Sequence, residues 1–383
     1  NFVFQNVTFK DNLCKSDYGG GTGLWVTNTE VITFDNCKFI NNVTLNSTSE
    51  RSRSPANMKY FAGDGGAIQY GHSTSIYNVD MVFKKCTFTQ NKAVRHGGAL
   101  AIQTCQKVEI SECTFDGNVA NYKPSSKLLF QDYYNLKEEG RGGAIYFNPV
   151  FTYKNNPNQQ VHDPANNFLR EAKIDSCTFT SNSAFDGYAI YIEGDDPGTK
   201  FIITNNRFKG NYDTVSNSME RGIITSEIEN LYEGKVVSSN KFEDRNIAPL
   251  LFVYHDGNTP TPTPPPTPLP TPIEIVYGDE QCGTRCYFVG QDENAIAGQL
   301  IIVEKESFDE SSSNDTESGG AIYFINCGLS IKDSKFTKCK STAGGGGAIY
   351  INNDFDQRNQ ILIEDVTFTD CKSYYGGAVY ILQ

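Results

Sequence analysis

The 383-residue sequence contains no long apolar run and has a mean hydropathy of -0.44. Nothing approaches the roughly 20 consecutive apolar residues that a membrane-spanning helix requires, so we expect no membrane contact by this segment. Methionine (3) and tryptophan (1) are scarce, whereas phenylalanine (25) and tyrosine (21) are plentiful. Since aromatic side chains are enriched in strands, this imbalance favours β structure over helix.

Positively charged residues are fewer than negatively charged ones. The 33 Lys and Arg and the 45 Asp and Glu give a net charge of -12. Such a chain is repelled by a phosphate backbone, so nucleic acid is not an expected partner. Histidine is rare, and the residues fall on separate repeats or loops, where they cannot form a metal site: His72, His96, His162 and His255. The G-x-S-x-G and P-loop motifs are missing. We expect no cofactor, no metal and no catalytic residue.

Two short motifs recur along the chain. The hexapeptide GGAIYF occurs at 142–147 and again at 319–324, with variants at 187–192, 346–351 and 376–381. Between its copies, a phenylalanine is followed three residues later by asparagine, as in FKDN, FINN, FTQN, FDGN, FTSN and FKGN. These and the degenerate copies mark about ten units with a shortest spacing of roughly 27–30 residues, which is typical of solenoid repeats.

One unit with almost no insertion, 319–345, shows what each repeat forms. Apolar residues alternate in it with period two, which indicates strands, and Gly, Asn, Asp and Ser supply tight turns. No crossover helix fits between the strands, so equivalent strands of successive units must pair in parallel. We therefore predict an all-β fold, a single right-handed parallel β-helix of about ten coils over 1–383.

The proline-rich stretch does not mark a domain boundary in this interpretation. APLLFV (248–253) fits the hexapeptide position, and GQLIIVEKESF (298–308) fits the strand before phenylalanine. We therefore predict that 254–297 is a Pro-rich loop insertion within one coil. We also expect the chain to be a segment of a longer protein.

The paired GGA[IVL]-x-[YFI] and FxxN motifs resemble the repeats of the chlamydial polymorphic outer-membrane proteins. Similar repeats occur in surface-protein families of parasitic protists such as trichomonads. The resemblance implies a β-helix displayed outside the cell and associated with adhesion, and thus an extracellular location through the secretory pathway. The sequence departs from the pattern late in the chain, where asparagine gives way to Arg245, Ser311, Cys339 and Cys371.

The fifth position of the hexapeptide, between two apolar residues, gives a column that is mostly aromatic. One interpretation is cross-strand stacking; the other is an outward ribbon of aromatic faces that contacts sugars or proteins. The candidate ligand-contact residues are Trp25, Tyr146, Tyr191, Phe252, Tyr323, Tyr350 and Tyr380.

Eleven cysteines favour an oxidising compartment, and the odd number leaves at least one unpaired. Four lie two residues before phenylalanine in consecutive coils and predict either a buried thiol ladder or vertical disulfides: Cys37, Cys86, Cys113 and Cys177. Cys339 and Cys371 share a column in neighbouring coils and are predicted to form an inter-coil disulfide. Cys282 and Cys286 are predicted to form a local one.

Four N-glycosylation sequons occur, at Asn6, Asn42, Asn46 and Asn314. A chain this rich in asparagine is expected to contain about this number of sequons by chance. The sequons are therefore compatible with secretion but are not evidence for it.

These features predict a non-enzymatic extracellular surface protein that acts in adhesion or as a structural or filament element. Its partners would be surface proteins or glycans of host or neighbouring cells. The alternative is a polysaccharide lyase or glycoside hydrolase of the pectate-lyase-like β-helix class, but the columns show no outward cluster of carboxylates. Strand patterns run to both ends of the chain without a cap, so either further coils cover the ends or copies stack end to end.

Overall fold

A computed structural model describes most of the repeat units. The described residues are 2–16, 24–26, 31–46, 63–70, 80–103, 105–120, 140–148, 171–192, 200–213, 223–226, 237–243, 273–277, 286–289, 299–313, 318–325, 328–341, 344–352 and 361–382. In this part of the chain all regular structure is β-strand, β1 to β37, and no helix that could cross a membrane occurs.

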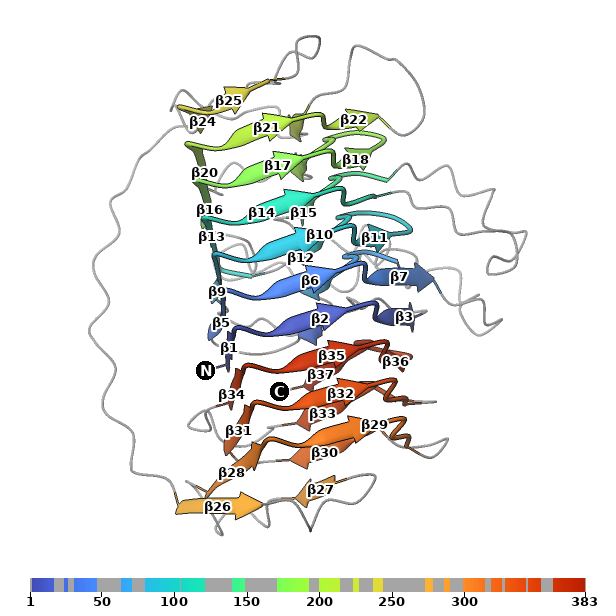
Figure 1. The fold of residues 1–383 in the computed structure, drawn as a ribbon. Coiled ribbons are helices and arrows are strands. Elements are labelled where there is room, and N and C mark those ends of the chain that lie inside the picture. Colours follow the sequence, from blue (N-terminus) through green and yellow to red (C-terminus); the bar gives the residue numbers. More distant parts are fainter. Residues whose placement is uncertain are drawn as a thin grey trace, which may run out of the picture.

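The strands form three long sheets and one short one, named here in the order in which each coil meets them (Figure 1). Sheet A has eleven strands, in the order β24 (Val237–Ser238), β20 (Lys200–Thr204), β16 (Glu171–Asp175), β13 (Lys107–Ser111), β9 (Asp80–Lys84), β5 (Val31–Asp35), β1 (Phe2–Gln5), β34 (Ile361–Glu364), β31 (Gly328–Lys332), β28 (Gln299–Glu304) and β26 (Ile273–Tyr277).

Sheet B has ten strands, in the order β25 (Lys241–Phe242), β21 (Arg207–Lys209), β17 (Thr178–Thr180), β14 (Thr114–Asp116), β10 (Thr87–Thr89), β6 (Lys38–Ile40), β2 (Thr8–Lys10), β35 (Thr367–Thr369), β32 (Lys335–Thr337) and β29 (Ser307–Asp309). The short sheet C contains β11 (Lys92–Ala93), β7 (Val43–Asn46), β3 (Leu13–Ser16) and β36 (Lys372–Ser373), together with the pair β18 (Ser183–Ala184) and β22 (Tyr212–Asp213).

Sheet D is built from the hexapeptides. Its ten strands follow the order β23 (Ile224–Ser226), β19 (Ile190–Ile192), β15 (Ile145–Asn148), β12 (Leu100–Gln103), β8 (Ile68–Tyr70), β4 (Leu24–Val26), β37 (Val379–Leu382), β33 (Ile349–Asn352), β30 (Ile322–Ile325) and β27 (Cys286–Val289).

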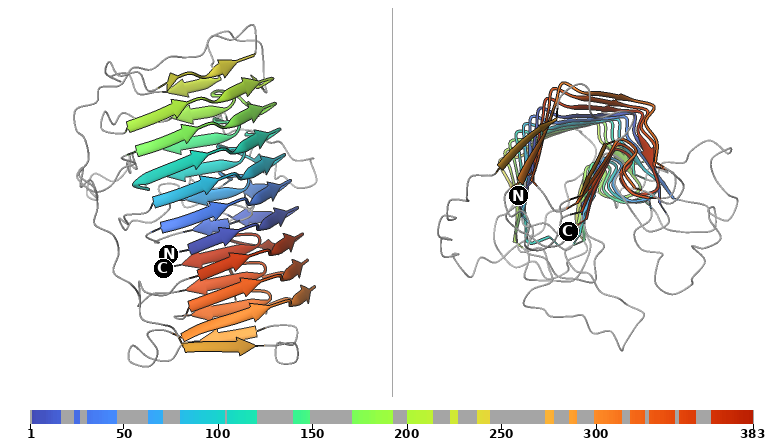
Figure 2. Two further views of the ribbon diagram at one scale, coloured as in Figure 1. Left: turned by 60° about the vertical axis from the view of Figure 1, so that its left-hand side comes forward. Right: turned by 90° about the horizontal axis from the view of Figure 1, so that it is seen from below.

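A complete coil among the described residues, such as β1 to β4, runs through the sheets in the order A, B, C and D. Equivalent strands of neighbouring coils pair in parallel, as in Phe9 with Phe39 and Tyr146 with Tyr191. The strands of sheet B point to the right in Figure 1, those of sheet D point back to the left, and each later coil of a half lies above the earlier one, so the coiling is right-handed (Figures 1 and 2). The predicted parallel β-helix is thereby confirmed.

Alternation along the strands and left-handed residues at the corners shape each coil. In β5, Ile32 and Phe34 are buried while the residues between them are partly exposed. The corner between sheets A and B begins with a residue at positive φ, such as Asn6 or Asn36, and the corner after sheet B with another, such as Asn41. Asn, Asp and Gly tolerate this backbone best and occupy many of these corners, while Lys, Glu, Gln or Ser occupies the others.

The core between sheets A, B and D contains a continuous ladder of stacked phenylalanine rings. Neighbouring rings lie 4.7–5.1 Å apart. The ladder runs Phe242, Phe208, Phe179, Phe115, Phe88, Phe39, Phe9, Phe368, Phe336, Phe308. The ten phenylalanines that mark the repeat in the sequence therefore form one column of the folded protein.

The order of the coils in the stack differs from their order in the chain. Strands β1, β2, β3 and β4 pair with β34, β35, β36 and β37, so the first and last coils are neighbours in the middle of the rod (Figure 1). Strands β24 and β25 lie at one end of the sheets, and β26 and β29 lie at the other.

The prediction that 254–297 is an insertion within one coil is therefore wrong. The strands before this segment and those after it do not share a coil, and β27 inside it forms sheet D of the lowest coil. The sequence could not reveal this arrangement, because the strand residues at every coil edge follow the same repeat pattern. A coil that follows the segment can stack above β24 and β25 or below β1 and β2 equally well by pattern, and the structure shows the second arrangement.

Candidate functional site

The aromatic column of sheet D was the main predicted contact site, and its upper part is buried. Tyr146 and Tyr191 retain 2% and 1% of their accessible surface. The ring of His96 stacks on Tyr146 at 4.5 Å, and the Arg141 guanidinium lies 4.8 Å from the centre of the Tyr191 ring. The expectation that these tyrosines face outward is wrong, because residues just before the hexapeptides, such as His96 and Arg141, fold back over the second face of sheet D.

In the lower part of the same column Tyr350 is buried, while Tyr323 and Tyr380 are partly exposed. Tyr323, Tyr350 and Tyr380 stack with ring centres 5.0 and 5.4 Å apart and nearly parallel planes. Burial raises the pKa of Tyr380 to about 12. Because the ring faces cover one another along the rod axis, only ring edges can meet a partner, which argues against a platform for stacking sugars.

For two other members of the column, Trp25 and Phe252, the structure describes no side chain. Trp25 is the register partner of Tyr380, so pairing of the first and last coils continues the column, but the Trp25 side chain lies outside the described residues. Phe252 lies outside them entirely.

A buried charged cluster beside the tyrosines was not predicted. The Asp64 carboxylate, fully buried, lies 3.3 Å from Nε of Arg95 and accepts a hydrogen bond of 3.1 Å from the backbone N–H of His96. Nδ1 of His96 accepts a bond of 3.1 Å from the backbone N–H of Arg141. Burial, with Arg95 and Arg141 nearby, lowers the pKa of His96 well below its usual value.

This cluster joins three successive coils rather than forming a reaction site. Asp64, His96 and Arg141 stand directly before a Gly-Gly pair and Arg95 one residue earlier, in GDGGAI, RHGGAL and GRGGAI. A charged residue in that position was the signal available in the sequence. Since Asp64 and His96 are shut off from solvent, they can hold the corners together but cannot reach a substrate.

The four-cysteine column is a ladder of buried free thiols. The backbone N–H of Cys86 donates to Sγ of Cys113 at 3.3 Å, and that of Cys113 donates to Sγ of Cys177 at 3.4 Å. Each thiol also donates to a carbonyl of the coil below, as Cys86 does to Phe34 at 3.4 Å. In the next coil Asn206 takes over the position, accepting from the Cys177 N–H at 2.8 Å. Of the two predicted alternatives, the structure shows the thiol ladder.

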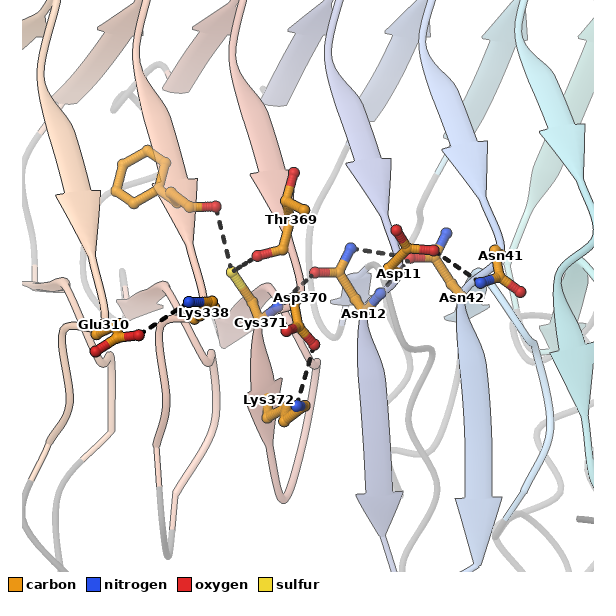
Figure 3. Close-up of polar contacts among 11 residues, drawn as sticks. Asp11, Asn12, Asn41, Asn42, Glu310, Lys338, Thr369, Asp370, Cys371 and Lys372 are labelled. Atoms are coloured by element: carbon orange, nitrogen blue, oxygen red, sulfur yellow. Dashed lines mark hydrogen bonds and ion pairs between the residues drawn. The ribbon is translucent and has the colours of Figure 1, made fainter. Parts of the chain in front are cut away.

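The disulfide predicted between Cys339 and Cys371 is not formed, and both are buried free thiols. They occupy the column of the FxxN asparagine. Sγ of Cys371 donates to the carbonyl of Phe336 at 3.6 Å, while its backbone N–H donates to Oδ1 of Asn12 at 3.1 Å (Figure 3). The thiols act as hydrogen-bonding substitutes for asparagine. The side chains of Cys282 and Cys286 lie outside the described residues.

The asparagines of the four sequons differ in how far the folded chain exposes them. Asn42 is fully buried, and its side-chain N–H groups donate to Oδ1 of Asn91 at 2.8 Å and to the carbonyl of Phe9 at 3.1 Å, so glycosylation of the folded chain at Asn42 is excluded. Asn6 is exposed at a corner and accepts a bond of 2.8 Å from Asn36. Asn314 and the side chain of Asn46 lie outside the described residues.

The outer faces of sheets A and B are the two broad surfaces that the described strands offer. Sheet A carries ion pairs between coils, in which Glu171 lies 3.7 Å from both Lys107 and Lys200. Charges on this face therefore neutralise one another.

Sheet B presents mainly threonine and basic side chains. The threonines before phenylalanine are partly exposed, and four coils carry an exposed Lys or Arg there: Lys38, Arg207, Lys241 and Lys335. At one end Arg207 and Lys241 hold Glu243 in ion pairs of 2.9 Å, which lower the pKa of Glu243 to about 2. Elsewhere on this face, partly exposed threonine hydroxyls lie beside exposed lysines on an acidic protein.

No constellation for chemistry occurs within the described ranges. They hold no group of three or more His, Cys, Asp or Glu that could bind a metal ion. His96 is the one histidine that the structure describes, since His72, His162 and His255 lie outside these ranges.

Comparison with known proteins gives one match. Residues 112–148, which include the corner before β14, the strand itself and the hexapeptide of β15, match the Chlamydia polymorphic membrane protein repeat. The chain thus carries a repeat of this type. No curated protein and no solved structure matches. The likeness to protist surface proteins stays a prediction.

Proposed function

We propose that the protein is a non-enzymatic extracellular surface rod that acts in adhesion, with the outer face of sheet B as its contact surface. The observation that carries the proposal is the polymorphic membrane protein repeat at 112–148, set in a regular stack of coils. A rigid parallel stack displays surface chemistry at a fixed spacing of about 4.8 Å per coil, which suits an extended partner.

We choose sheet B because the side chains of the other two surfaces already interact mainly with one another. The faces of the sheet D tyrosines are covered by their neighbours, and the charges of sheet A pair between coils. On sheet B, the hydroxyl groups of Thr87, Thr114 and Thr178 form a partly exposed row. Hydroxyl donors and acceptors flanked by basic side chains suit glycans or acidic protein surfaces of neighbouring or host cells.

A matched pair of substitutions tests this assignment. Thr87→Glu places a negative charge in the middle of the sheet B face, where it repels an acidic partner, and Thr33→Glu makes the same change on sheet A. Both threonines are partly exposed strand residues, so neither variant should unfold. We expect binding in a cell-adhesion assay and on a glycan array to fall at least about fivefold for Thr87→Glu and to stay unchanged for Thr33→Glu.

Equal effects of the two substitutions would reject sheet B as the contact face. A separate assay addresses the enzymatic alternative by incubating the protein with polygalacturonate and other acidic polysaccharides. The release of new reducing ends or unsaturated products above background would overturn the non-enzymatic proposal.

A further inference from the structure

The contact between the first and last coils, called here the seam, is a complete coil-to-coil interface. All four sheets cross it, with Phe2–Gln5 on Ile361–Glu364 in sheet A and Leu24–Val26 on Val379–Ile381 in sheet D. Sheets B and C cross it through the pairs β2 with β35 and β3 with β36. No strand of the first coil is left without a partner at this step.

Hydrogen bonds at the seam match those elsewhere in the rod. The N–H groups of Thr8 and Leu13 donate to the carbonyls of Val366 and Cys371 at 2.9 and 3.2 Å. In the other direction, those of Asp365 and Asp370 donate to the carbonyls of Gln5 and Lys10 at 3.0 and 3.1 Å.

Side chains continue across the seam as well. The ring of Phe9 stacks on that of Phe368 at 5.1 Å, and the asparagine ladder continues through the bond from the Cys371 N–H to Asn12 (Figure 3). Nothing in the bonding distinguishes this step from one between coils that follow each other in the chain.

The seam is nevertheless formed by two halves that only one stretch of chain connects. The upper half contains β1 to β25 and the lower half β26 to β37, and residues 244–272 lie between them. The connection must reach from one end of an eleven-stranded sheet to the other, about 48 Å at ~4.8 Å per strand. Roughly 30 residues can extend to at most about 100 Å, so the link is long enough with much to spare.

We propose that the seam also forms between copies of this chain, so that the lower half of one molecule stacks on the upper half of another. The partner surface is the one that the seam already shows, with the same register and the same side-chain ladders. Exchange of an identical element between protomers needs no new complementarity, only a connection that allows it. The proposal does not depend on the adhesive function.

The length of the connection decides which form prevails. A link that is long enough to span the rod holds the two seam faces at an effective concentration in the millimolar range, so dilute protein closes the seam within one molecule. If the link is too short to span the rod, the seam cannot close within one molecule. The seam faces must then be satisfied by another copy, either in an exchanged dimer or in a head-to-tail chain.

A cross-linking experiment detects a seam between copies directly. Thr8 and Thr367 are register partners at the seam and are partly exposed. Neighbouring strands lie within the Cα separation of 4.4–6.8 Å that a disulfide needs. One copy carries Thr8→Cys and the other Thr367→Cys, so a disulfide between them forms only across a seam that joins two molecules. The control mixture pairs Thr8→Cys with Thr178→Cys, because Thr178 pairs with Thr114 and Arg207 instead.

Both cysteine variants are placed in a chain that lacks residues 249–272, which leaves a link of about 20 Å at full extension. The matched control replaces 249–272 with a Gly/Ser sequence of equal length. Random pairing makes about half of the dimers mixed, so we expect up to about half of the shortened chains to form disulfide-linked dimers under mild oxidation at micromolar concentration. The length-matched control should show at least tenfold less, and Thr8→Cys with Thr178→Cys should show none above the parent chain.

Shortened chains that stay monomeric without cross-links, or equal yields from both cysteine pairs, would overturn the proposal. If the shortened chain does not fold, the chain of natural length decides. Its two cysteine variants are unfolded together and refolded near 1 mM. Seam-specific cross-links that increase with protein concentration support the proposal, and their absence overturns it.

Discussion

The corner after each sheet B strand requires a buried group that both accepts and donates hydrogen bonds. Oδ1 of Asn118 accepts from the backbone and side-chain N–H groups of Asn91 at 3.1 and 3.0 Å, and its own amide donates to the carbonyl of Phe88 at 2.9 Å. Cysteine can fill this position, as Cys371 does, because a thiol is both a weak donor and a weak acceptor. The column of the FxxN asparagine therefore requires a side chain that can form hydrogen bonds at this position, and more than one residue type can provide it.

This interchange predicts unequal effects of two substitutions at one position. Asn118→Ala leaves buried groups of Asn91 and Phe88 without their partner and should lower the free energy of unfolding by about 3 kcal/mol. Asn118→Cys should cost less than half as much. Urea denaturation followed by circular dichroism measures both. Equal losses would mean that only the size of the side chain matters in this column.

His96 predicts a pH dependence. The folded protein keeps its imidazole neutral, with a lowered pKa, between Arg95 and Arg141, whereas the unfolded chain takes up a proton below about pH 6.5. This contribution to stability is complete above that pH and is lost as the pH falls, by up to about 1.4 kcal/mol per unit. His96→Gln cannot titrate, so its stability should change less between pH 7 and pH 5. Parallel slopes for the two proteins in urea denaturation would contradict this.

At the scale of the strands, much of the arrangement could be predicted. Period-two alternation gave the strands, and the FxxN motif gave the register, because Phe9, Phe39 and Phe88 do pair in one column. The burial of Tyr146 and Tyr191 could not be predicted from alternation. It depends on the fold-back at sheet C, whose strands are as short as two residues and carry no periodic signal.

The hexapeptide corner leaves no room for a side chain at Gly98, although Tyr188 occupies the equivalent position in a later coil. A Cβ on Gly98 would lie 2.1 Å from the carbonyl oxygen of Gly143 in the next coil. Gly98→Ala must therefore push two coils apart, and we expect it to lower the free energy of unfolding by about 3 kcal/mol or more. Thermal and urea denaturation should both show the loss.

A glycine at a different corner is the control. Gly117 has a φ of 62°, but Asn41 has a φ of 50° in the equivalent position, and the nearest atom to a Cβ on Gly117 is 3.6 Å away. Gly117→Asn should thus change stability by less than about 0.5 kcal/mol. If both substitutions were harmless, the close approach of the coils at Gly98 would be refuted.

At the scale of the whole molecule, the sequence predicted the kind of stack but not its order. Thr8–Lys10 pairs with Lys38–Ile40 on one side and with Thr367–Thr369 on the other, using the same register. Since any coil edge fits any other, the repeat pattern contains no information about which coils become neighbours. The connection between the halves and the stability of the whole stack decide that.

Hydrogen exchange should report the seam in solution. The amides of Thr8, Leu13, Asp365 and Asp370 are bonded across it. Dilute protein should therefore protect them as strongly as the amide of Lys38, which is bonded between two coils of the upper half. Mass spectrometry of peptides covering 2–16 and 361–374 can measure this. Exchange at the rate of free peptides would show that the two halves do not stack as described.

Pairing of the first and last coils also determines how the rod responds to tension. A pull between β1 and β37 acts across a single coil step in the middle of the molecule and not along its length (Figures 1 and 2). Bonds at that step would then break one after another, as in opening a zipper, and the required force should be small. The halves would separate with their own coils intact, and the connecting segment would extend between them, so that the rod behaves under load as two stiff bodies joined by a tether.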